Sequence, residues 1–598
     1  MDNLNARPLI SQLGEDLGWL EKHCRTQPDQ ARSAGQLRLA AALVRNCVGP
    51  FLDDEPATPL HVVVVGGAGA GKSTLSNLLS GAAAAEANPQ AGFTRHPIAY
   101  TGASTATNWA GHPGFLGPLQ RLAKPGPSNL DQDVYQVRRV QSDPNTFDLL
   151  KDYVVWDCPD MTTWAATGYI PRLIEAAALA DVLVYAASDE RYNDEVPTQF
   201  LAMLLQTGKP VVVCLMKMRE ADATALVAHF QKEVVAQLPK GVVSVLPIPF
   251  LPAAQLADPA RSAAKYRIPL LNQVSVLGSP AAAARRRTVV GAINYLVRNL
   301  DQLLAVAKND LAALQRWQQM VEEGKREFSG RYQREYLSTE RFRGFDEALI
   351  RLMQLLEFPG VGKLFTGAMN LLRAPIRLLS GWIGKAVGRN EAGNRPELPV
   401  LDEALTGWID LTRKESARYA STHPLWAHIS KGFHSAGLAD SFREQFTQQL
   451  RTFHTAQSNE VDRTARAIYE ELEKRPVLLN SLRSGKLALE LATIAGTVVA
   501  VGFNVLTSCI LVPLVTTLSH QLVEMLGKQF VDAQREQTRQ HQAALMNQYL
   551  AEPLATWLTK WPTTGGSSFE RLQLALRRIP DGIRQLNELT QKRLATPG

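Results

Sequence analysis

A run of four valines leads directly into a glycine-rich turn near residue 60, and this junction constrains the fold more than any other stretch. Residues 62–65 are all valine, and a proline stands at position 59. A continuous apolar run of this length is typical of a strand buried on both faces. The sequence LSNLL at 75–79 then continues as a helix. The junction is therefore predicted to be a strand–loop–helix unit of an α/β domain with a parallel sheet.

The loop of this unit fits G-x-x-x-x-G-K-[ST], the pattern of the phosphate-binding P-loop. Its glycines let consecutive backbone N–H groups turn toward phosphates, and the helix N-terminus adds partial positive charge. We expect Lys72 to reach the β- and γ-phosphates and the Ser73 hydroxyl to bind Mg²⁺. The alternative, a glycine turn that binds nothing, is disfavoured by the position of the motif between a strand and a helix. The predicted nucleotide-binding loop comprises Gly66, Gly67, Ala68, Gly69, Ala70, Gly71, Lys72, Ser73 and Thr74.

Length and composition bound the class of protein. At 598 residues the chain is expected to hold several domains, because single cores stop growing near ~250–300 residues. The net charge of +7 suits an anionic surface, and no nucleic-acid recognition motif is visible. Five cysteines without C-x-x-C spacing and an N-terminus without an apolar signal region indicate reduced thiols in a cytoplasmic protein.

Four further short apolar runs predict the remaining strands of a doubly wound, mostly parallel sheet. They occupy residues 153–156, 182–186, 211–216 and 242–248, with longer segments between them. We therefore predict an α/β P-loop NTPase domain at 56–285, preceded at 1–55 by a helical segment that packs with the stalk.

Helical periodicity dominates the chain after this domain. Apolar residues recur at helical spacing from Ile293 to Leu314 and again from Phe442 to Phe453. Such long patterns are typical of a bundle or stalk. The predicted all-α region comprises a stalk at 286–357, a bundle at 400–486 and C-terminal helices at 521–598 that return to the bundle.

One segment of this region has the composition of a membrane-surface helix. Residues 358–389 contain five Lys or Arg residues, a tryptophan and no acidic residue. A basic, amphipathic segment of this kind suits the interface of an anionic bilayer, and a helical hairpin packed in the bundle is an equal alternative. We assign 358–399 as a basic amphipathic segment with its linker.

A second segment is uncharged over a length comparable to the thickness of a membrane. Residues 491–519 hold no charged side chain over 29 positions. At about 1.5 Å per residue, such a helix is long enough to cross a ~30 Å hydrocarbon core. The segment also contains several Thr, Ser and Asn residues, so a hairpin in one leaflet and a buried bundle core stay open. We predict a membrane-directed segment at 487–520.

Three further stretches resemble motifs of the translation-factor-related P-loop GTPases. Thr-Arg-His-Pro begins at Thr94, Asp-Cys-Pro-Asp begins at Asp157 directly after a predicted strand, and Lys217 ends the strand at 211–216. The order of P-loop, Thr, Asp-x-Pro and strand-terminal Lys is similar to that of these GTPases. The Thr-Arg-x-Pro element resembles the dynamin superfamily. Helices on both sides of the nucleotide domain resemble the bacterial dynamin-like and mitofusin-like proteins.

The resemblance implies GTP and Mg²⁺ as ligands and assigns roles to matching positions. Thr94 would close on Mg²⁺ and the γ-phosphate, and with Lys72 it is the candidate catalytic residue. Asp157 would hold Mg²⁺ through water, which makes Ser73, Thr94 and Asp157 the candidate metal-binding residues. Lys217 would lay its aliphatic stem along the base.

The resemblance also implies partners and a cellular setting. It implies a GTPase at the cytoplasmic face of a membrane, in contact with anionic lipid. Such a protein pairs through its nucleotide domains or forms a larger homo-oligomer. It couples nucleotide state to movement of the helical stalk and to membrane association or remodelling.

Two positions depart from the family pattern. Asp160 stands where the family has a glycine whose N–H contacts the γ-phosphate, and Arg219 stands where it has the Asp that reads guanine. Glu220 and Asp222 are the nearest carboxylates that a shifted loop would supply. Two alternatives follow: a nucleotide-binding switch or scaffold with weak or no hydrolysis, and a P-loop NTPase that is not selective for guanine.

Overall fold

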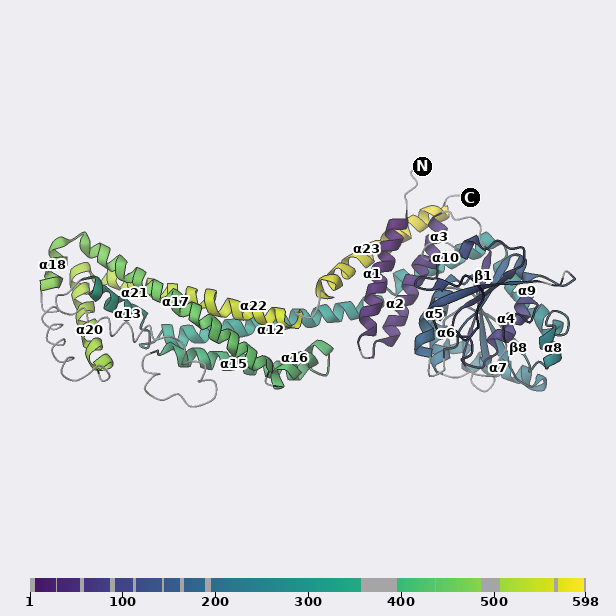
Figure 1. Cartoon of the computed structure of the whole chain (residues 1–598), viewed down its shortest axis with the longest axis horizontal. Helices are drawn as coiled ribbons and strands as arrows, with labels where there is room; N and C mark the ends of the chain where they lie inside the picture. The colour runs from purple at the N-terminus through teal and green to yellow at the C-terminus, as the bar shows by residue number, and fades with distance from the viewer. Residues whose placement is uncertain are drawn as a thin grey trace. The chain divides into compact units, whose positions relative to one another are not determined.

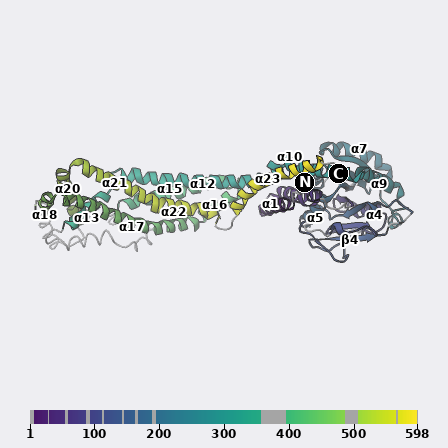
Figure 2. The same ribbon diagram turned by 90° about the horizontal axis from the view of Figure 1, so that it is seen from above.

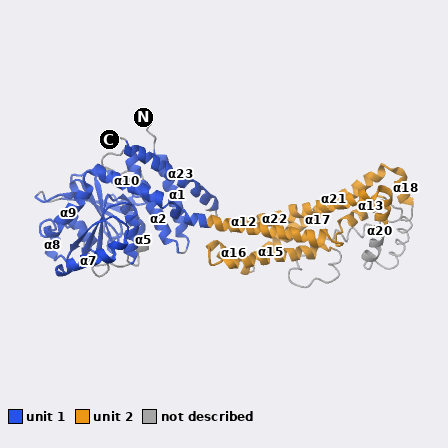
Figure 3. Cartoon of the chain, turned by 180° about the vertical axis from the view of Figure 1, so that it is seen from behind, with its two compact units in different colours: residues 1–309, 568–598 blue, residues 310–567 orange. Residues whose placement is uncertain are grey.

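The chain forms two compact units, which Figure 3 colours separately. The first comprises residues 1–309 and 568–598, and the second comprises residues 310–567. The computed structural model describes residues 6–27, 29–53, 59–86, 92–110, 115–141, 143, 145–161, 166–188, 195–356, 395–435, 437–484, 506–563 and 568–595.

An eight-stranded sheet forms the centre of the described part of the first unit. The strand order is β3-β4-β2-β5-β1-β6-β7-β8, and all neighbouring pairs are parallel except β2 with β5. This confirms the predicted α/β fold with a mostly parallel sheet. The strands are β1 (Leu60–Gly66), β2 (Ile98–Gly102), β3 (Gln120–Arg121), β4 (Val134–Val140), β5 (Tyr153–Asp157), β6 (Val182–Ser188), β7 (Val211–Met216) and β8 (Val242–Ile248).

Both faces of this sheet are covered by helices, which explains the uninterrupted valines of β1. Val63 and Val65 pack into one hydrophobic core, and Val62 and Val64 pack into the other. Figure 1 shows α5 and α6 on one side of the sheet and α4 and α9 on the opposite side. These helices, with the shorter helices nearby, are α4 (Lys72–Ser80), α5 (Ala166–Leu179), α6 (Glu195–Leu205), α7 (Ala223–Glu233), α8 (Ala253–Ala257) and α9 (Ala264–Gly278).

The two ends of the chain contribute further helices to the first unit. Leu13, Leu17 and Leu20 on α1 are buried in the same core as α5. Asp16 on α1 accepts a 3.1 Å hydrogen bond from Arg571 on α23, so the first and last helices are joined. This group comprises α1 (Arg7–Arg25), α2 (Ala31–Leu43), the π-helical turn η1 (Val44–Val48), α3 (Gly49–Leu52), α10 (Ala281–Arg298), α11 (Leu300–Leu303) and α23 (Ser568–Ala595).

The described part of the second unit is helical, which confirms the predicted all-α region. Helices α12, α17 and α22 run side by side in two perpendicular views (Figures 1 and 2). Trp317 on α12 donates a 3.2 Å hydrogen bond to the Leu558 carbonyl on α22. The helices are α12 (Ala305–Tyr332, which begins in the first unit), α13 (Gly344–Leu355), α15 (Glu397–Tyr419), α16 (Pro424–His434), α17 (Gly437–Glu473), α18 (Pro476–Ser484), α20 (Leu506–Leu526), α21 (Lys528–Met546) and α22 (Glu552–Lys560).

The two predicted membrane-directed segments lie largely outside the described residues. The basic segment at 358–399 is described only from residue 395, and the uncharged segment at 487–520 only from residue 506, within α20. In the part of the chain that the structure describes, no helix combines the length and apolar character needed to cross a membrane.

Candidate nucleotide-binding site

The loop between β1 and α4 follows a tight path that its glycines permit. A Cβ atom at Gly66 would lie 2.4 Å from the carbonyl oxygen of Ala186 on β6. Gly71 has a left-handed φ of 94°, and a Cβ atom there would lie 2.9 Å from the Met216 side chain. Contacts under 3 Å force a neighbour to move, and left-handed backbone favours glycine. The loop therefore passes close to the carboxyl ends of β6 and β7.

A cavity of about 310 Å³ opens beside this loop. It lies at the carboxyl ends of the parallel strands, where open α/β sheets bind their ligands. It is lined by Gly69, Gly71, Lys72, Ser73, Thr74, Glu86, Gly92, Phe93, Thr94, Asp160, Met216, Lys217, Pro249, Phe250, Leu251 and Leu256.

The Lys72 side chain is buried at the phosphate end of the cavity. Its Nζ atom donates a 2.9 Å hydrogen bond to the Gly67 carbonyl oxygen. Burial lowers the pKa of Lys72, and the charges of Asp160 and then Asp157 oppose this effect. A desolvated ammonium group gains most from an anionic ligand, because the interior screens charge poorly. The site is therefore electrostatically suited to bind a polyphosphate.

Asp157, the last residue of β5, lies next to the P-loop serine. Ser73 Oγ donates a 2.9 Å hydrogen bond to Asp157 Oδ2, whereas Oδ1 is buried and has no hydrogen-bond partner among the residues that the structure describes. Burial raises the pKa of Asp157, and the nearby Lys72 charge is the largest opposing influence. A buried carboxylate with a spare oxygen beside a hydroxyl is a donor set that Mg²⁺ accepts. These residues therefore fit the metal that the motifs imply.

Thr94 lines the cavity and approaches the same carboxylate. Burial raises the pKa of Asp157, and the Thr94 side chain is among the neighbours that lower it. The next residue is fixed at both backbone groups: Arg95 N–H donates to the Ser128 carbonyl at 3.0 Å, and its carbonyl accepts from Arg172 at 2.7 Å. The structure thus brings Thr94, Ser73 and Asp157 together from three separate segments.

Lys217 also lines the cavity, and it lies directly after β7. Its φ of 67° is left-handed, which costs a residue with a side chain about 1 kcal/mol or more. Its backbone N–H donates a 3.1 Å hydrogen bond to the Ile248 carbonyl at the end of β8. Phe250 and Leu251 follow β8 and line the cavity beside Lys217. Strain of this kind clusters at binding sites.

The sequence did not predict the apolar residues that line the cavity after β8. Phe250, Leu251 and Leu256 follow β8 in a stretch that carries none of the motifs identified in the sequence. The available signal was positional, since residues after a parallel strand lie at the ligand-binding edge of the sheet.

The carboxylates near Arg219 do not line the cavity. The Arg219 side chain is 87% exposed and pairs with Asp222 at 2.8 Å. Glu220 pairs with Lys265 on α9. Both acids that a shifted loop would supply are therefore engaged at the surface.

The predicted site residues divide into three groups. Seven of them line the cavity: Gly69, Gly71, Lys72, Ser73, Thr74, Thr94 and Lys217. Asp157 does not line it but accepts a hydrogen bond from Ser73, which does. The other predicted loop residues, Gly66, Gly67, Ala68 and Ala70, belong to the same turn without lining the cavity.

Comparison with known proteins identifies the class of the nucleotide domain. Residues 61–217 match the family model described as 50S ribosome-binding GTPase. The first unit therefore contains a P-loop domain of GTPase type, as the motif order predicts.

No curated protein matches the chain in sequence. Two solved structures, both of an oligomerised bacterial dynamin pair described as a mechanism for long-range sensing and tethering of membranes, match at 11% and 12% identity. Each match covers 96% of this chain and 95% of the other, with TM-scores of 0.38 and 0.37.

Proposed function

We propose that this chain is a dynamin-like GTPase that binds GTP with Mg²⁺ and hydrolyses it. The observation that carries the proposal is the convergence of Lys72, Ser73, Thr94 and Lys217 on one cavity, with Asp157 hydrogen-bonded to Ser73. The match of residues 61–217 to a GTPase family supports guanine nucleotide as the ligand.

Each side chain has a role that its position allows. The loop amides and the Lys72 ammonium group bind the β- and γ-phosphates, and Lys217 with Phe250 and Leu251 encloses the base. Ser73, Asp157 and Thr94 would hold Mg²⁺, which would supply positive charge beside the transferring phosphoryl group. Thr94 also orients the attacking water. Hydrolysis then depends on positioning and electrostatics rather than on a covalent intermediate.

The proposal assigns membrane association to the helical region. Residues 358–389 carry basic and aromatic side chains without an acid, and residues 491–519 are uncharged. Both features suit contact with an anionic bilayer. We assign nucleotide binding to residues 56–285 and membrane contact to the segments at 358–399 and 487–520, with pairing between nucleotide domains. Nucleotide state would be transmitted through the helices that connect them.

A second candidate function, a nucleotide-dependent switch with little turnover, is favoured by one residue. Asp160 is buried in the wall of the cavity. Among the neighbouring charges, it has the largest effect on the pKa of Lys72. A carboxylate at this position repels a γ-phosphate, so it favours bound diphosphate over a reactive triphosphate.

Nucleotide and membrane binding test the proposal. Full-length protein should bind a fluorescent GTP analogue with Mg²⁺, and Lys72→Ala should weaken this binding at least about 100-fold. Lys151→Ala, an exposed substitution outside the cavity, is the matched control. The protein should also sediment with vesicles containing anionic phospholipid but not with neutral vesicles. Equal binding by wild type and Lys72→Ala would contradict the nucleotide site, and absence of vesicle binding would contradict the membrane role.

A further inference from the structure

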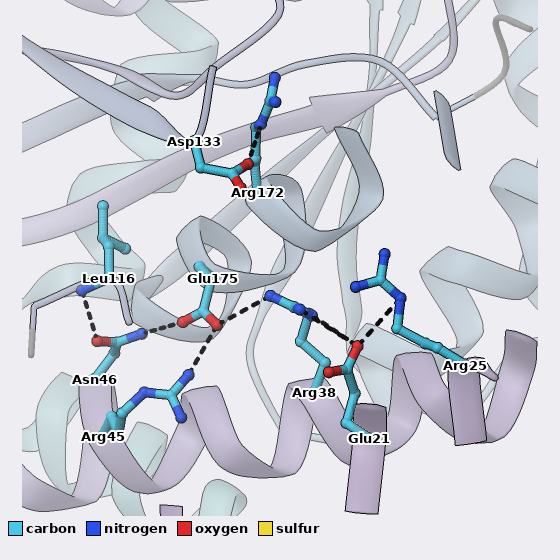
Figure 4. A network of polar contacts seen from close by, with 9 residues as sticks. All are labelled: Glu21, Arg25, Arg38, Arg45, Asn46, Leu116, Asp133, Arg172 and Glu175. Atoms are coloured by element: carbon cyan, nitrogen blue, oxygen red, sulfur yellow. Dashed lines mark hydrogen bonds and ion pairs between the residues drawn. The ribbon is translucent and has the colours of Figure 1, made fainter. Parts of the chain in front are cut away.

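Helix α5 carries two buried charged side chains one turn apart, and they contact different parts of the first unit. Arg172 and Glu175 are buried, and neither lines the nucleotide cavity. Figure 4 shows Arg172 beside Asp133 and Glu175 among side chains of the N-terminal helices. Residues three apart lie on the same side of a helix, so one rigid turn connects both sets of contacts.

Arg172 fixes the backbone next to Thr94. Its Nη1 atom donates to the carbonyl oxygen of Arg95 at 2.7 Å and to Asp131 at 2.9 Å. Its Nε atom donates to Asp133 at 2.8 Å. Two carboxylates hold the planar guanidinium in one orientation, and this geometry makes the bond to the carbonyl directional. The position of the Thr94–Arg95 segment therefore depends on the position of α5.

Glu175 fixes the same helix to the π-helical turn that follows α2. Its Oε1 atom accepts a 2.8 Å hydrogen bond from Arg45, and its Oε2 atom accepts a 3.1 Å hydrogen bond from Asn46. Arg38 lies 3.7 Å from the same carboxylate. A buried carboxylate with several donors is rigidly held, and the loss of its charge removes the carboxylate that pairs with Arg45 and weakens the hold on Arg38.

The contacts continue from α2 to both ends of the chain. Arg38 also pairs with Glu21 on α1 at 3.3 Å, and Asp16 on α1 accepts a hydrogen bond from Arg571 on α23. A continuous series of polar contacts therefore runs from the Thr94 segment through α5 to α1, α2 and α23.

We propose that Arg172 is a positioning residue for GTP hydrolysis, and that Glu175 sets its position by holding α5 on the N-terminal helices. Through α5, the packing of α1, α2 and α23 controls how well Thr94 closes on the metal and the γ-phosphate. This inference rests on the proposed function. Small displacements of a positioned group are enough to change turnover strongly.

The first test separates nucleotide affinity from turnover in Arg172→Gln. We expect the affinity for a fluorescent GTP analogue without Mg²⁺ to stay within about twofold of wild type, because the phosphate loop is untouched. The gain in affinity on adding Mg²⁺ should shrink, and kcat should fall roughly 10- to 100-fold. Arg172→Lys should recover part of the turnover, because it keeps a single donor to the Arg95 carbonyl. A merely structural role predicts equal loss of Mg²⁺-free binding and no recovery by lysine.

Arg139→Gln is the matched control for the loss of an arginine–carbonyl bond. Arg139 on β4 donates to the Ala103 carbonyl at 2.7 Å, away from the Thr94 segment. Its turnover should equal that of wild type. A loss as large as that of Arg172→Gln would overturn the assignment.

A double-mutant cycle tests the link to Glu175. Glu175→Gln keeps the shape of the side chain and a contact to Asn46, but it removes the charge shared by Arg38 and Arg45. We expect kcat to fall several-fold, and the double variant Arg172→Gln/Glu175→Gln to turn over no more slowly than Arg172→Gln alone, since coupled residues are not additive. Additive losses would show that Glu175 does not act through Arg172.

The same measurements separate failure of this inference from failure of the proposed function. If wild type binds the GTP analogue without turnover, the hydrolytic function fails, and the Mg²⁺-dependent affinity of Arg172→Gln still decides the inference. If wild type turns over GTP and Arg172→Gln does so at the same rate, only the inference fails. Absence of nucleotide binding by wild type would overturn both.

Discussion

The Ser73 hydroxyl and the Asp157 carboxylate, 84 positions apart in sequence, lie 2.9 Å apart in space. Their contact follows from the sheet, because β1 and β5 are adjacent parallel strands with Val64 opposite Asp157. The P-loop begins two residues after Val64, so both motifs emerge at the same edge of the sheet. The contact between the candidate metal-binding residues is therefore a direct consequence of strand order.

This contact leads to a prediction for Asp157→Asn. The amide keeps the shape of the side chain but removes a buried charge whose pKa burial raises. We expect the melting temperature of the nucleotide-free protein to change little, because the gain from losing a desolvated carboxylate is offset by the loss of its charge beside Lys72. The Mg²⁺-dependent gain in GTP affinity should fall about tenfold or more, measured by calorimetry at fixed Mg²⁺. A variant that responds to Mg²⁺ like wild type would show that Asp157 does not contribute to the metal site.

Asp160→Gly should favour the triphosphate. Asp160 lies in the wall of the cavity, and among the neighbouring charges it raises the pKa of Lys72 the most. Without this carboxylate, the Lys72 ammonium group can interact with the γ-phosphate alone. The backbone N–H of the glycine can also approach the γ-phosphate more closely. The affinity for a non-hydrolysable GTP analogue should rise about tenfold relative to the affinity for GDP. Asp160→Asn separates charge from backbone approach, since it removes only the charge. Unchanged triphosphate-to-diphosphate ratios in both variants would contradict this role of Asp160.

Arg219→Asp should increase the preference for guanine over adenine nucleotides. Arg219 is exposed and pairs only at the surface with Asp222 among the contacts described, so its replacement leaves the core intact. An aspartate two residues after Lys217 restores the register in which a carboxylate accepts hydrogen bonds from the guanine edge. The ratio of GTP to ATP affinity should rise about tenfold or more. Arg219→Asn provides the neutral control, and it should give a smaller rise. Competition binding measures both ratios, and an equal ratio in wild type and Arg219→Asp would mean that this loop does not face the base.

His61 makes the first unit sensitive to acid. Burial lowers the pKa of His61 to about 3, and its Nδ1 atom accepts a 3.1 Å hydrogen bond from the Trp156 ring. In the unfolded chain the imidazole binds a proton near pH 6.5. As pH falls from about 6.5 toward 3, the unfolded state therefore binds a proton that the folded state does not, and the free energy of unfolding falls.

His61→Asn tests this pH dependence. Its Oδ1 atom offers an acceptor in place of Nδ1 but does not titrate. We expect lower stability than wild type at pH 7, because the smaller side chain leaves space in the core. Between pH 7 and 4 the free energy of unfolding should depend less steeply on pH than in wild type. Urea unfolding followed by tryptophan fluorescence measures this slope, and an identical slope in the two proteins would rule out His61 as its source.

The central strands could be predicted because burial on both faces leaves a plain signal. The valines of β1 and the apolar runs of β5, β6 and β7 need no distant information. The edge strand β8 is recognisable from a similar apolar run. Strand β4 was missed because buried polar residues interrupt it: Gln136 on β4 contacts His96, 40 positions away. Strand β2 is short and pairs with β4 and antiparallel with β5, so its partners are not evident from local periodicity.

Site residues were predictable where they belong to a local sequence motif. They were less predictable where the packing of distant segments brings them to the site. Lys72 and Ser73 sit in one contiguous motif, and Lys217 follows a clear strand, so the structure finds them in one cavity. Phe250 and Arg172 carry no motif. Phe250 reaches the cavity through the end of β8, and Arg172 reaches the Arg95 carbonyl through the placement of α5. Such contacts depend on three-dimensional neighbours that no sequence spacing specifies.

Phosphate release from GTP by the full-length protein tests the central claim most directly. The measurement compares wild type with Lys72→Ala at saturating Mg²⁺, with ATP as the competing substrate. The account predicts turnover of GTP that Lys72→Ala abolishes and that an excess of ATP inhibits only weakly. Turnover that survives in Lys72→Ala, or wild-type protein that releases no phosphate from GTP, would contradict it.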